Sequence, residues 1–270
     1  MPSNKIIFTK VQRNDIKSKI ITSTQNHIFK EALKLQDKKF RDKNNCFFIE
    51  GKKQVEEIPK DWNIKQIFIS EKYKNNAKSV KNAIVFSDHL FNKLSTTKSP
   101  QGIIAVLEKK HYKIEDVISN MGMFIILENI QDPGNLGTII RSADAFAFKA
   151  VFVSKRSTDI YSNKTLSATM GSIFHLPVVD NIDIQNLVKL LKKEKFTIFA
   201  ASLKGKKHLN TVKIPKKSVF VVGNEANGIK NETENLADQL IKINMHGSCQ
   251  SLNAAIAASI IMYETTKDLW

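Results

Sequence analysis

The chain has 270 residues, 42% hydrophobic and 25% charged, and these ordinary values exclude a chain that is disordered throughout. Lys and Arg number 42 against 26 Asp and Glu, so the net charge is +16, and residues 1–110 contribute +12 of it (23 basic and 11 acidic side chains). This concentration of positive charge favours a polyanion such as nucleic acid as the partner, although a general richness in lysine would also produce it.

The lack of a recognisable targeting signal and the two isolated cysteines favour a reducing cytoplasm as the location of the protein. Residues 1–5 lack the apolar core of a signal peptide, and the longest apolar stretch, residues 254–263, is too short to span a bilayer. Cys46 and Cys249 stand in unrelated contexts, without the spacing of metal ligands. We therefore expect no disulfide framework, no metal site and no membrane attachment.

The front of the chain predicts a small α/β domain over residues 21–107. Residues 1–20 are polar and rich in lysine, which predicts a flexible arm before this domain. The spacing of apolar residues predicts one helix over residues 25–40. Four short apolar runs predict strands at residues 46–51, 64–69, 83–86 and 102–107. Residues 108–121 are mostly polar and predict a linker.

A second α/β pattern begins after the linker and predicts another domain over residues 122–270. Buried-type strands are expected at residues 123–127, 150–153, 196–200, 219–222 and 240–243, with helix-length segments between them. Such a pattern is typical of a mostly parallel sheet covered on both faces. Ligands of these sheets bind beyond the carboxyl ends of the strands.

The first of three polar segments follows the strand at residues 123–127 and runs from Glu128 to Phe146. It contains an Asp-Pro-Gly-Asn turn that leads into a helix, where Gly137 permits a close approach of backbone. Arg141 lies further along this helix, from where it could reach the region of Asn135. A helix cap and a surface arginine are the alternative interpretation.

The second segment, Gly223 to Ile229, follows the strand at residues 219–222. Glycines at both ends, Gly223 and Gly228, allow its backbone to wrap a ligand closely. Glu225 offers a carboxylate to a hydroxyl, an amine or an arginine. A plain turn capped by Asn and Gly is the alternative.

The third segment, Ile243 to Glu264, leads from a strand end through a loop into a helix rich in Ala and Ser. The helix is expected to start near Ser251, with Ser251 and Asn253 close to its free N–H groups. The alternative is a serine cap on a buried core helix. Together the three segments place three polar loops after three strands of one sheet.

Motifs that the sequence lacks narrow the class further. It has no Gly-x-Gly-x-x-Gly after a strand, which disfavours an oxidoreductase of the dinucleotide-binding type, and no phosphate loop of an NTPase. It has no His-Glu-x-x-His and no cluster of Cys and His, which disfavours a zinc site.

The three segments, in this order, resemble the three motifs of the SpoU (TrmH-like) family of the SPOUT superfamily of RNA methyltransferases. The matching stretches are residues 128–148, 220–229 and 243–264, with a connecting stretch at residues 164–179. The resemblance covers about residues 122–266. Residues 21–107 look, less specifically, like the family's N-terminal RNA substrate-binding domain.

This resemblance implies a trefoil-knotted catalytic domain, a rare exception to the rule that chains do not thread loops. It implies transfer of a methyl group from S-adenosylmethionine to a ribose 2′-hydroxyl, without a metal, in a homodimer whose sites lie near the subunit interface. Ribosomal RNA is the expected substrate. Transfer RNA, or a catalytically silent factor that binds RNA or assists ribosome assembly, are the alternatives.

The resemblance also implies roles for individual residues. Nine are expected to contact S-adenosylmethionine: Ala201, Ser202, Leu203, Gly223, Asn224, Gly228, Ile243, Met245 and Leu252. Five are expected to form the polar catalytic cluster: Asn135, Arg141, Glu225, Ser251 and Asn253. Arg141 is the candidate for activating the hydroxyl, although binding the adjacent phosphate is the milder role, because arginine normally stays protonated.

Overall fold

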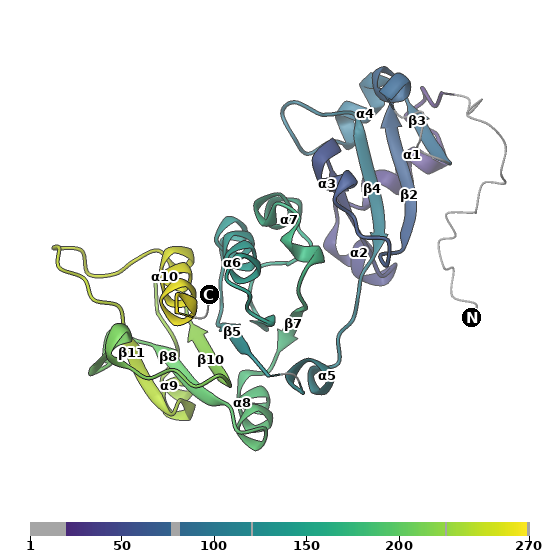
Figure 1. The fold of residues 1–270 in the computed structure, drawn as a ribbon. Coiled ribbons are helices and arrows are strands. Elements are labelled where there is room, and N and C mark those ends of the chain that lie inside the picture. The colour runs from purple at the N-terminus through teal and green to yellow at the C-terminus, as the bar shows by residue number, and fades with distance from the viewer. Residues whose placement is uncertain (1–19, 77–81, 120, 225, 269–270) are drawn as a thin grey trace. The chain divides into compact units, whose positions relative to one another are not determined.

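The computed structural model describes residues 20–76, 82–119, 121–224 and 226–268 of the chain (Figure 1). The arm predicted at residues 1–20 therefore lies, apart from Ile20, outside the described residues. The chain forms two compact units. The N-terminal unit extends to Lys110 and includes Tyr161–Asn163, and the C-terminal unit comprises His111–Ile160 and the chain from Lys164 onward.

The N-terminal unit is built on a four-stranded mixed sheet in the order β1-β4-β2-β3, in which only the β2–β3 pairing is parallel. The four predicted strands are confirmed, with bounds that differ by a residue at most. The strands are β1 (Cys46–Glu50), β2 (Ile64–Ser70), β3 (Ala83–Phe86) and β4 (Ile103–Glu108). Five short helices accompany them: α1 (His27–Lys34), α2 (Lys38–Lys43), α3 (Lys52–Glu56), η1 (Lys72–Asn76) and α4 (Asp88–Leu94).

The prediction of one helix over residues 25–40 is wrong, because the chain forms two helices there. Helix α1 is capped at its start by Asn26, and Leu35 ends it. Asp37 then caps α2, because its carboxylate accepts the backbone N–H of Lys39 at 2.7 Å. An aspartate in this position favours a new helix start over continuation of the old one.

Several chain segments meet at one edge of this sheet. Strand β4 starts beside the ends of β1 and β2, since Ile104 pairs with Glu50 and Ile103 pairs with Ile69. The loops and short helices that follow β1 and β2, and the loop that precedes β4, therefore leave the sheet at the same edge.

The C-terminal unit contains a seven-stranded sheet in the order β7-β6-β5-β10-β8-β11-β9, and every pairing is parallel. The five predicted strands are confirmed within one residue of their expected starts. They are β5 (Met123–Leu127), β6 (Ala150–Ser154), β8 (Thr197–Ala201), β10 (Ser218–Val222) and β11 (Gln239–Lys242). The sequence did not predict the edge strands β7 (Val178–Ile182) and β9 (Lys207–His208), nor helix α5 (Ile114–Ile118) within the polar stretch.

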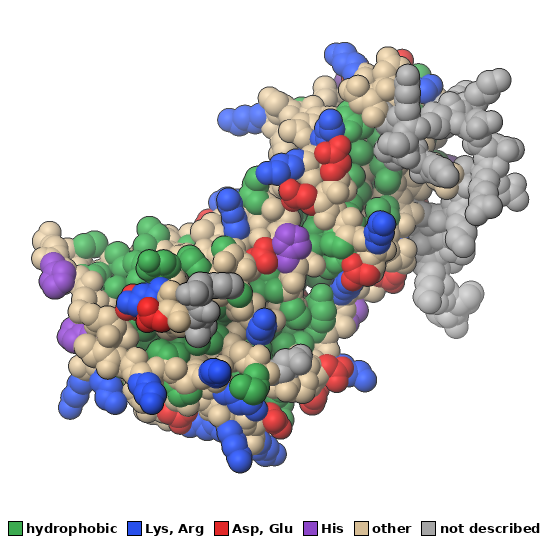
Figure 2. All heavy atoms as spheres, viewed as in Figure 1, with side chains coloured by type: hydrophobic (Ala, Val, Ile, Leu, Met, Phe, Trp, Pro, Cys, Tyr) green, Lys and Arg blue, Asp and Glu red, His purple; other side chains and the backbone are tan. Residues whose placement is uncertain are grey.

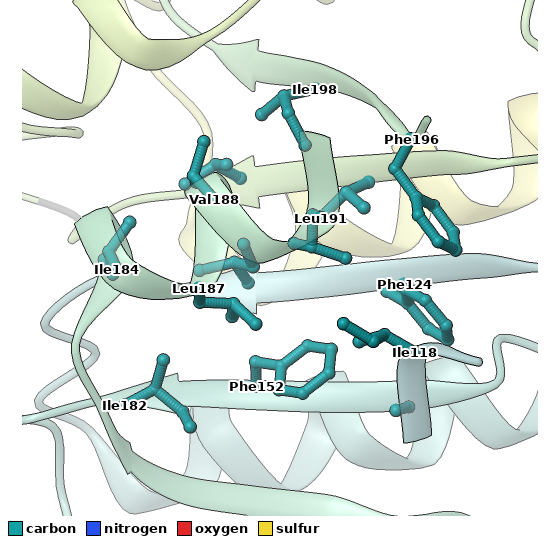
Figure 3. Packing of buried hydrophobic residues seen from close by; sticks show 14 of the residues in the cluster. Ile118, Phe124, Phe152, Ile182, Ile184, Leu187, Val188, Leu191, Phe196 and Ile198 are labelled. Carbon is teal, nitrogen blue, oxygen red and sulfur yellow. The ribbon is translucent and has the colours of Figure 1, made fainter. Parts of the chain in front are cut away.

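Helices cover both faces of the parallel sheet. Helix α8 (Ile184–Lys193) lies over one face, where Figure 3 shows Leu187 and Leu191 packed towards Phe124 and Phe152 of the sheet. Alternate strand residues point to the opposite face. There, two thirteen-residue helices pack against each other: α6 (Pro133–Ala145) and α10 (Ala254–Thr266). The smaller elements are α7 (Asn163–Thr169), η2 (Ser172–Phe174), η3 (Leu209–Thr211) and α9 (Asn231–Leu236).

No helix of the described residues is long and apolar enough to cross a membrane. Within the same residues, no three His, Cys, Asp or Glu side chains gather in a way that could hold a metal ion.

Gly137 lies where helix α6 meets α7 with almost no space between the two backbones. A Cβ atom at this position would lie 2.4 Å from the carbonyl oxygen of Thr165 and 2.5 Å from the Cβ of Ala168. The close approach that the sequence predicted for this glycine is therefore present, and it serves helix packing.

We expect Gly137→Ala to lower the free energy of unfolding by about 1–3 kcal/mol, because the helices must move apart to admit the methyl group. Urea unfolding followed by circular dichroism measures this loss. Gly247→Ala is the matched control, since a Cβ atom there meets nothing within 4 Å. Equal stability of the two variants would contradict the packing argument.

Candidate active site

A cavity of about 460 Å³ lies at the carboxyl ends of β8, β10 and β11. The structure brings all nine of the predicted cofactor residues to it, although they are spread over 52 positions of the chain. They are Ala201, Ser202, Leu203, Gly223, Asn224, Gly228, Ile243, Met245 and Leu252. Ser251, from the predicted catalytic cluster, lines the same cavity.

The loop after β10 forms one wall of the cavity and closes on itself. The backbone N–H groups of Asn224 and Gly228 each donate to the other residue's carbonyl, at 3.1 and 2.8 Å. A Cβ atom on Gly223 would lie 2.2 Å from the carbonyl group of Gly228. Gly223 has to be glycine because the chain contacts itself there, and it also lines the cavity, where the sequence predicted that it would contact the cofactor. Glu225 lies outside the described residues.

Glu128, which directly follows β5, holds in place the part of the chain where this loop ends and α9 begins. Its carboxylate is almost fully buried and accepts two hydrogen bonds, one from the backbone N–H of Lys230 and one from the hydroxyl of Thr233, both at 3.0 Å. The amide of Asn224 donates to the carbonyl of Asn129 at 3.0 Å. Glu128 is not among the site residues predicted from the sequence. The signal was a carboxylate directly after a fully apolar strand, where a charge is buried only with partners.

A second carboxylate that the sequence analysis missed, Glu234 on α9, lines the cavity. It accepts hydrogen bonds from the Ser202 hydroxyl at 2.6 Å and from the Lys204 ammonium at 2.8 Å. The hydrogen bond from Lys204, followed by that from Ser202, lowers the pKa of Glu234 below its usual value. The carboxylate therefore stays charged and ties α9 to the loop after β8.

Two asparagines of the predicted catalytic cluster meet beside this cavity. The amide of Asn253 donates to the side-chain oxygen of Asn135 at 3.1 Å and so joins the first polar segment to the third. Asn253 also caps α10, accepting the N–H of Ala255 at 2.8 Å. The helix begins at Ala254, which corrects its expected start near Ser251. Asn253 supplies the cap that stops it from extending further back.

Arg141 is exposed on α6, six residues beyond Asn135. It is not among the residues that line the cavity, and its side chain makes no ion pair or hydrogen bond with the described residues. Among the described residues no hydrogen bond or ion pair joins Arg141 to Asn135, from which it is separated by six positions of α6.

Asp132 starts helix α6. Its carboxylate accepts the backbone N–H of Asn135 at 2.8 Å and the Lys164 ammonium at 3.1 Å. The first of these bonds, with help from the second, lowers the pKa of Asp132. The cap therefore holds Asn135 at the first turn of α6, beside Asn253.

A wholly parallel sheet with a ligand-sized cavity at its strand ends defines an α/β protein that binds a small molecule at the carboxyl edge of its sheet. Comparisons with known proteins narrow this class. A model of the SpoU rRNA Methylase family matches residues 122–263, and one of the MRM3-like substrate binding domain matches residues 26–105. The chain belongs to the SpoU rRNA methylase family.

Known proteins similar to this chain agree with the assignment. The 23S rRNA (guanosine(2553)-2′-O)-methyltransferase RlmP of Bacillus subtilis is 32% identical over 248 residues, covering 91% of this chain and 98% of that protein. The 23S rRNA (guanosine-2′-O-)-methyltransferase RlmB of Neisseria meningitidis serogroup B is 27% identical over 65% of this chain and 72% of its own length. The crystal structure of an AdoMet bound rRNA methyltransferase from Sinorhizobium meliloti superposes with a TM-score of 0.85 at 28% identity, covering 94% of this chain and 99% of that one.

We expect Asp132→Ala to lower the free energy of unfolding by about 1 kcal/mol at neutral pH, the usual contribution of a helix cap. Because folding lowers the pKa of Asp132, this contribution is present above its ordinary value of about 3.9 and is lost as the pH falls through the lower value of the folded state. Urea unfolding of both proteins at neutral and acidic pH measures the difference. Asp132→Asn, which keeps an oxygen for the cap, is the control, and a difference that persists undiminished in acid would refute this account.

Proposed function

We propose that this protein transfers a methyl group from S-adenosylmethionine to a ribose 2′-hydroxyl of ribosomal RNA. One observation carries the proposal. The nine residues that the family resemblance assigns to the cofactor line a single cavity, and that cavity adjoins the Asn135–Asn253 pair. The names of the relatives from Bacillus subtilis and Neisseria meningitidis support ribosomal RNA as the substrate. The bacterial origin of both relatives supports the cytoplasm as the place of this reaction.

The cavity fits S-adenosylmethionine in size and chemistry. Its volume of about 460 Å³ lies within the range of roughly 300–1,000 Å³ that is typical of small-molecule sites. Leu203, Met245 and Leu252 offer apolar surface to a purine ring, while Ser202 and Asn224 offer polar groups.

When bound, S-adenosylmethionine supplies the methyl group in an electrophilic form. The residues of the chain have to hold the ribose hydroxyl in line with it, and alignment of this kind accounts for a large part of the rate gain in such transfers. We assign Asn135, Ser251 and Asn253 to hold the ribose. Glu225 keeps the catalytic role that the family resemblance gives it.

Arg141 is assigned to the substrate's phosphate. A ribose hydroxyl is a weak nucleophile and has to give up its proton as its oxygen bonds to the methyl carbon. Arginine stays protonated, so its guanidinium binds the adjacent phosphate and polarises the hydroxyl, while the proton passes to water. Its exposed place on α6 is compatible with this role, because the phosphate arrives from solvent.

The protein is proposed to work as a homodimer through the exposed face of α10. Ile256, Ile260 and Tyr263 are exposed on this helix and border a shallow groove with Thr138 of α6. Figure 2 shows hydrophobic side chains gathered over the region of α10. Arg141 lies three residues beyond Thr138, on the same side of α6, so a partner subunit on this face would come close to it.

The trefoil knot is proposed on the order of the strands. The chain runs outward from β10 to β11, which lies beyond β8 in the sheet. It then returns, and α10 packs against α6 and β10. A return of this kind, after a strand that lies between the earlier strands β8 and β9, is compatible with a final helix threaded through an earlier loop.

Transfer of labelled methyl from S-adenosylmethionine to total RNA, taken from a strain that lacks the gene, tests the proposal. Label in large ribosomal RNA, recovered as a 2′-O-methyl nucleoside, is the expected result. Label in the transfer RNA fraction would support the same reaction but identify transfer RNA, in place of ribosomal RNA, as the substrate. Absence of label in every fraction, with S-adenosylmethionine bound in calorimetry, would favour the silent RNA-binding factor.

In the same assay we expect Arg141→Ala to lower the transfer rate by roughly 100-fold, because the phosphate and the hydroxyl lose their guanidinium partner. The affinity for S-adenosylmethionine, measured by calorimetry, stays unchanged, since Arg141 does not line the cavity. Lys149→Ala is the control for loss of an exposed cation outside that cavity. Full activity of Arg141→Ala would remove this residue from the mechanism.

We expect the double variant Ile256→Glu, Ile260→Glu to be a monomer, because two charges would have to be buried in the apolar interface. Light scattering coupled to size exclusion measures the mass. Ile64→Glu adds a charge at an exposed isoleucine of the other unit and leaves the dimer intact. A wild-type protein with the mass of one chain would end the dimer proposal.

A further inference from the structure

We propose that the N-terminal unit holds an unpaired RNA nucleotide against Tyr73, at the sheet edge where β1 and β2 end and β4 begins. This inference rests on the proposed function, since it names the part of the RNA that the unit recognises. It assigns a binding site and a ligand class within the domain, and it depends on contacts of this unit alone.

Two adjoining hollows lie at this edge, with volumes of about 280 and 460 Å³. Three side chains border both of them: Tyr73, Asn76 and Gln101. These side chains therefore form the wall between the hollows. A base placed in either hollow would meet an aromatic ring and two amides, which is the chemistry that base stacking and recognition of base edges require.

Tyr73 is fixed in position before any ligand arrives. Its backbone N–H donates to the hydroxyl of Ser70 at 3.2 Å. On its other side is Gly102, where the φ angle is +81° and an added Cβ atom would lie 2.7 Å from the Cβ of Tyr73. Only glycine permits so close an approach. The ring is half-buried, so it keeps an accessible surface while its backbone is held.

Gln101 is also held in place. Its amide oxygen accepts the backbone N–H of Lys52 at 2.7 Å, which ties the loop before β4 to the start of α3. Because this bond occupies the amide oxygen of Gln101, its amide nitrogen is the group that remains to donate to a ligand. Two N–H donors fixed beside an aromatic ring suit the acceptor atoms of a nucleobase edge.

Lysines line the two hollows and offer positive charge to the phosphates of the RNA. Lys52 and Lys53 line the larger hollow and Lys72 lines the smaller one, and all three are exposed. Two acidic side chains are present as well, with Glu56 at 3.9 Å from Lys52 and Asp88 at 3.7 Å from Lys72. Exposed ion pairs this long contribute little, so a phosphate can take their place.

The arrangement favours unpaired RNA over a duplex. Bases in an A-form helix are stacked on each other, and their faces are closed to an aromatic side chain. A half-buried ring between two hollows is reached only by a base that has left its stack. A loop, a bulge or a strand end of the RNA presents such a base.

Fluorescence anisotropy with the full chain tests the proposal, using a labelled unpaired RNA oligonucleotide of mixed sequence and a fully paired duplex of the same composition. We expect Tyr73→Ala to weaken binding of the unpaired RNA by about tenfold, the effect of losing one base stack, and to leave duplex binding unchanged. Tyr73→Phe, which keeps the ring, binds like wild type. Circular dichroism checks that each variant is folded.

The double variant Lys52→Gln, Lys53→Gln provides a second test that leaves Tyr73 and the sheet untouched. It flattens the slope of log affinity against log salt for unpaired RNA by roughly 0.7 for each lysine that contacts a phosphate. Lys39→Gln is the matched control, since Lys39 is exposed on α2, which precedes the start of β1 at the opposite sheet edge.

Two results would overturn the proposed site. One is an equal loss of affinity for the unpaired RNA and for the duplex in Tyr73→Ala. The other is an unchanged slope of log affinity against log salt in the lysine double variant. Neither measurement involves S-adenosylmethionine or turnover. Failure of this site therefore stays distinct from failure of the methyl transfer, which the labelling assay reports.

Discussion

The buried carboxylate of Glu128 is the interaction on which the ligand cavity depends. It crosses from the end of β5 to the backbone of Lys230 and the hydroxyl of Thr233, at the start of α9. A buried charge with both partners in place has one low-energy arrangement, and a missing partner costs far more than the bond itself contributes. The position of α9, which carries Glu234 to the cavity and through it holds Ser202, follows from this contact.

The strands were predictable because burial leaves a simple pattern. Met123–Leu127 is fully apolar and fully buried, and the sequence placed this strand to the residue. The edge strand β7 was not predicted because it contains the polar residues Asp180 and Asn181, and Asn181 adopts a positive φ angle of 56°. The sequence predicted helix at residues 25–40 but not its division into α1 and α2. Apolar spacing continues across Asp37, whereas the carboxylate of Asp37 starts a new helix.

The site was predictable where the motifs determine it and not where distant partners do. The nine residues assigned to the cofactor from the family resemblance all line one cavity. Glu128 and Glu234, in contrast, depend on partners that are distant in the sequence: Glu128 and Thr233 lie 105 positions apart. Gly223 was predicted to lie at the ligand, and the structure adds a second reason for glycine at this position, the close carbonyl of Gly228. Arg141 is exposed on α6, and neither the sequence pattern nor its contacts within the described residues identify a partner for it.

The hydrogen bond between Asn135 and Asn253 joins residues 118 positions apart, and its later member stands at the start of the last helix that the structure describes. During translation the N-terminal unit can therefore fold on the ribosome long before this bond exists. The cavity, which Leu252 and Ala254 help to line, can close only when α10 has left the exit tunnel. The cavity is therefore among the last parts of the fold to form during synthesis.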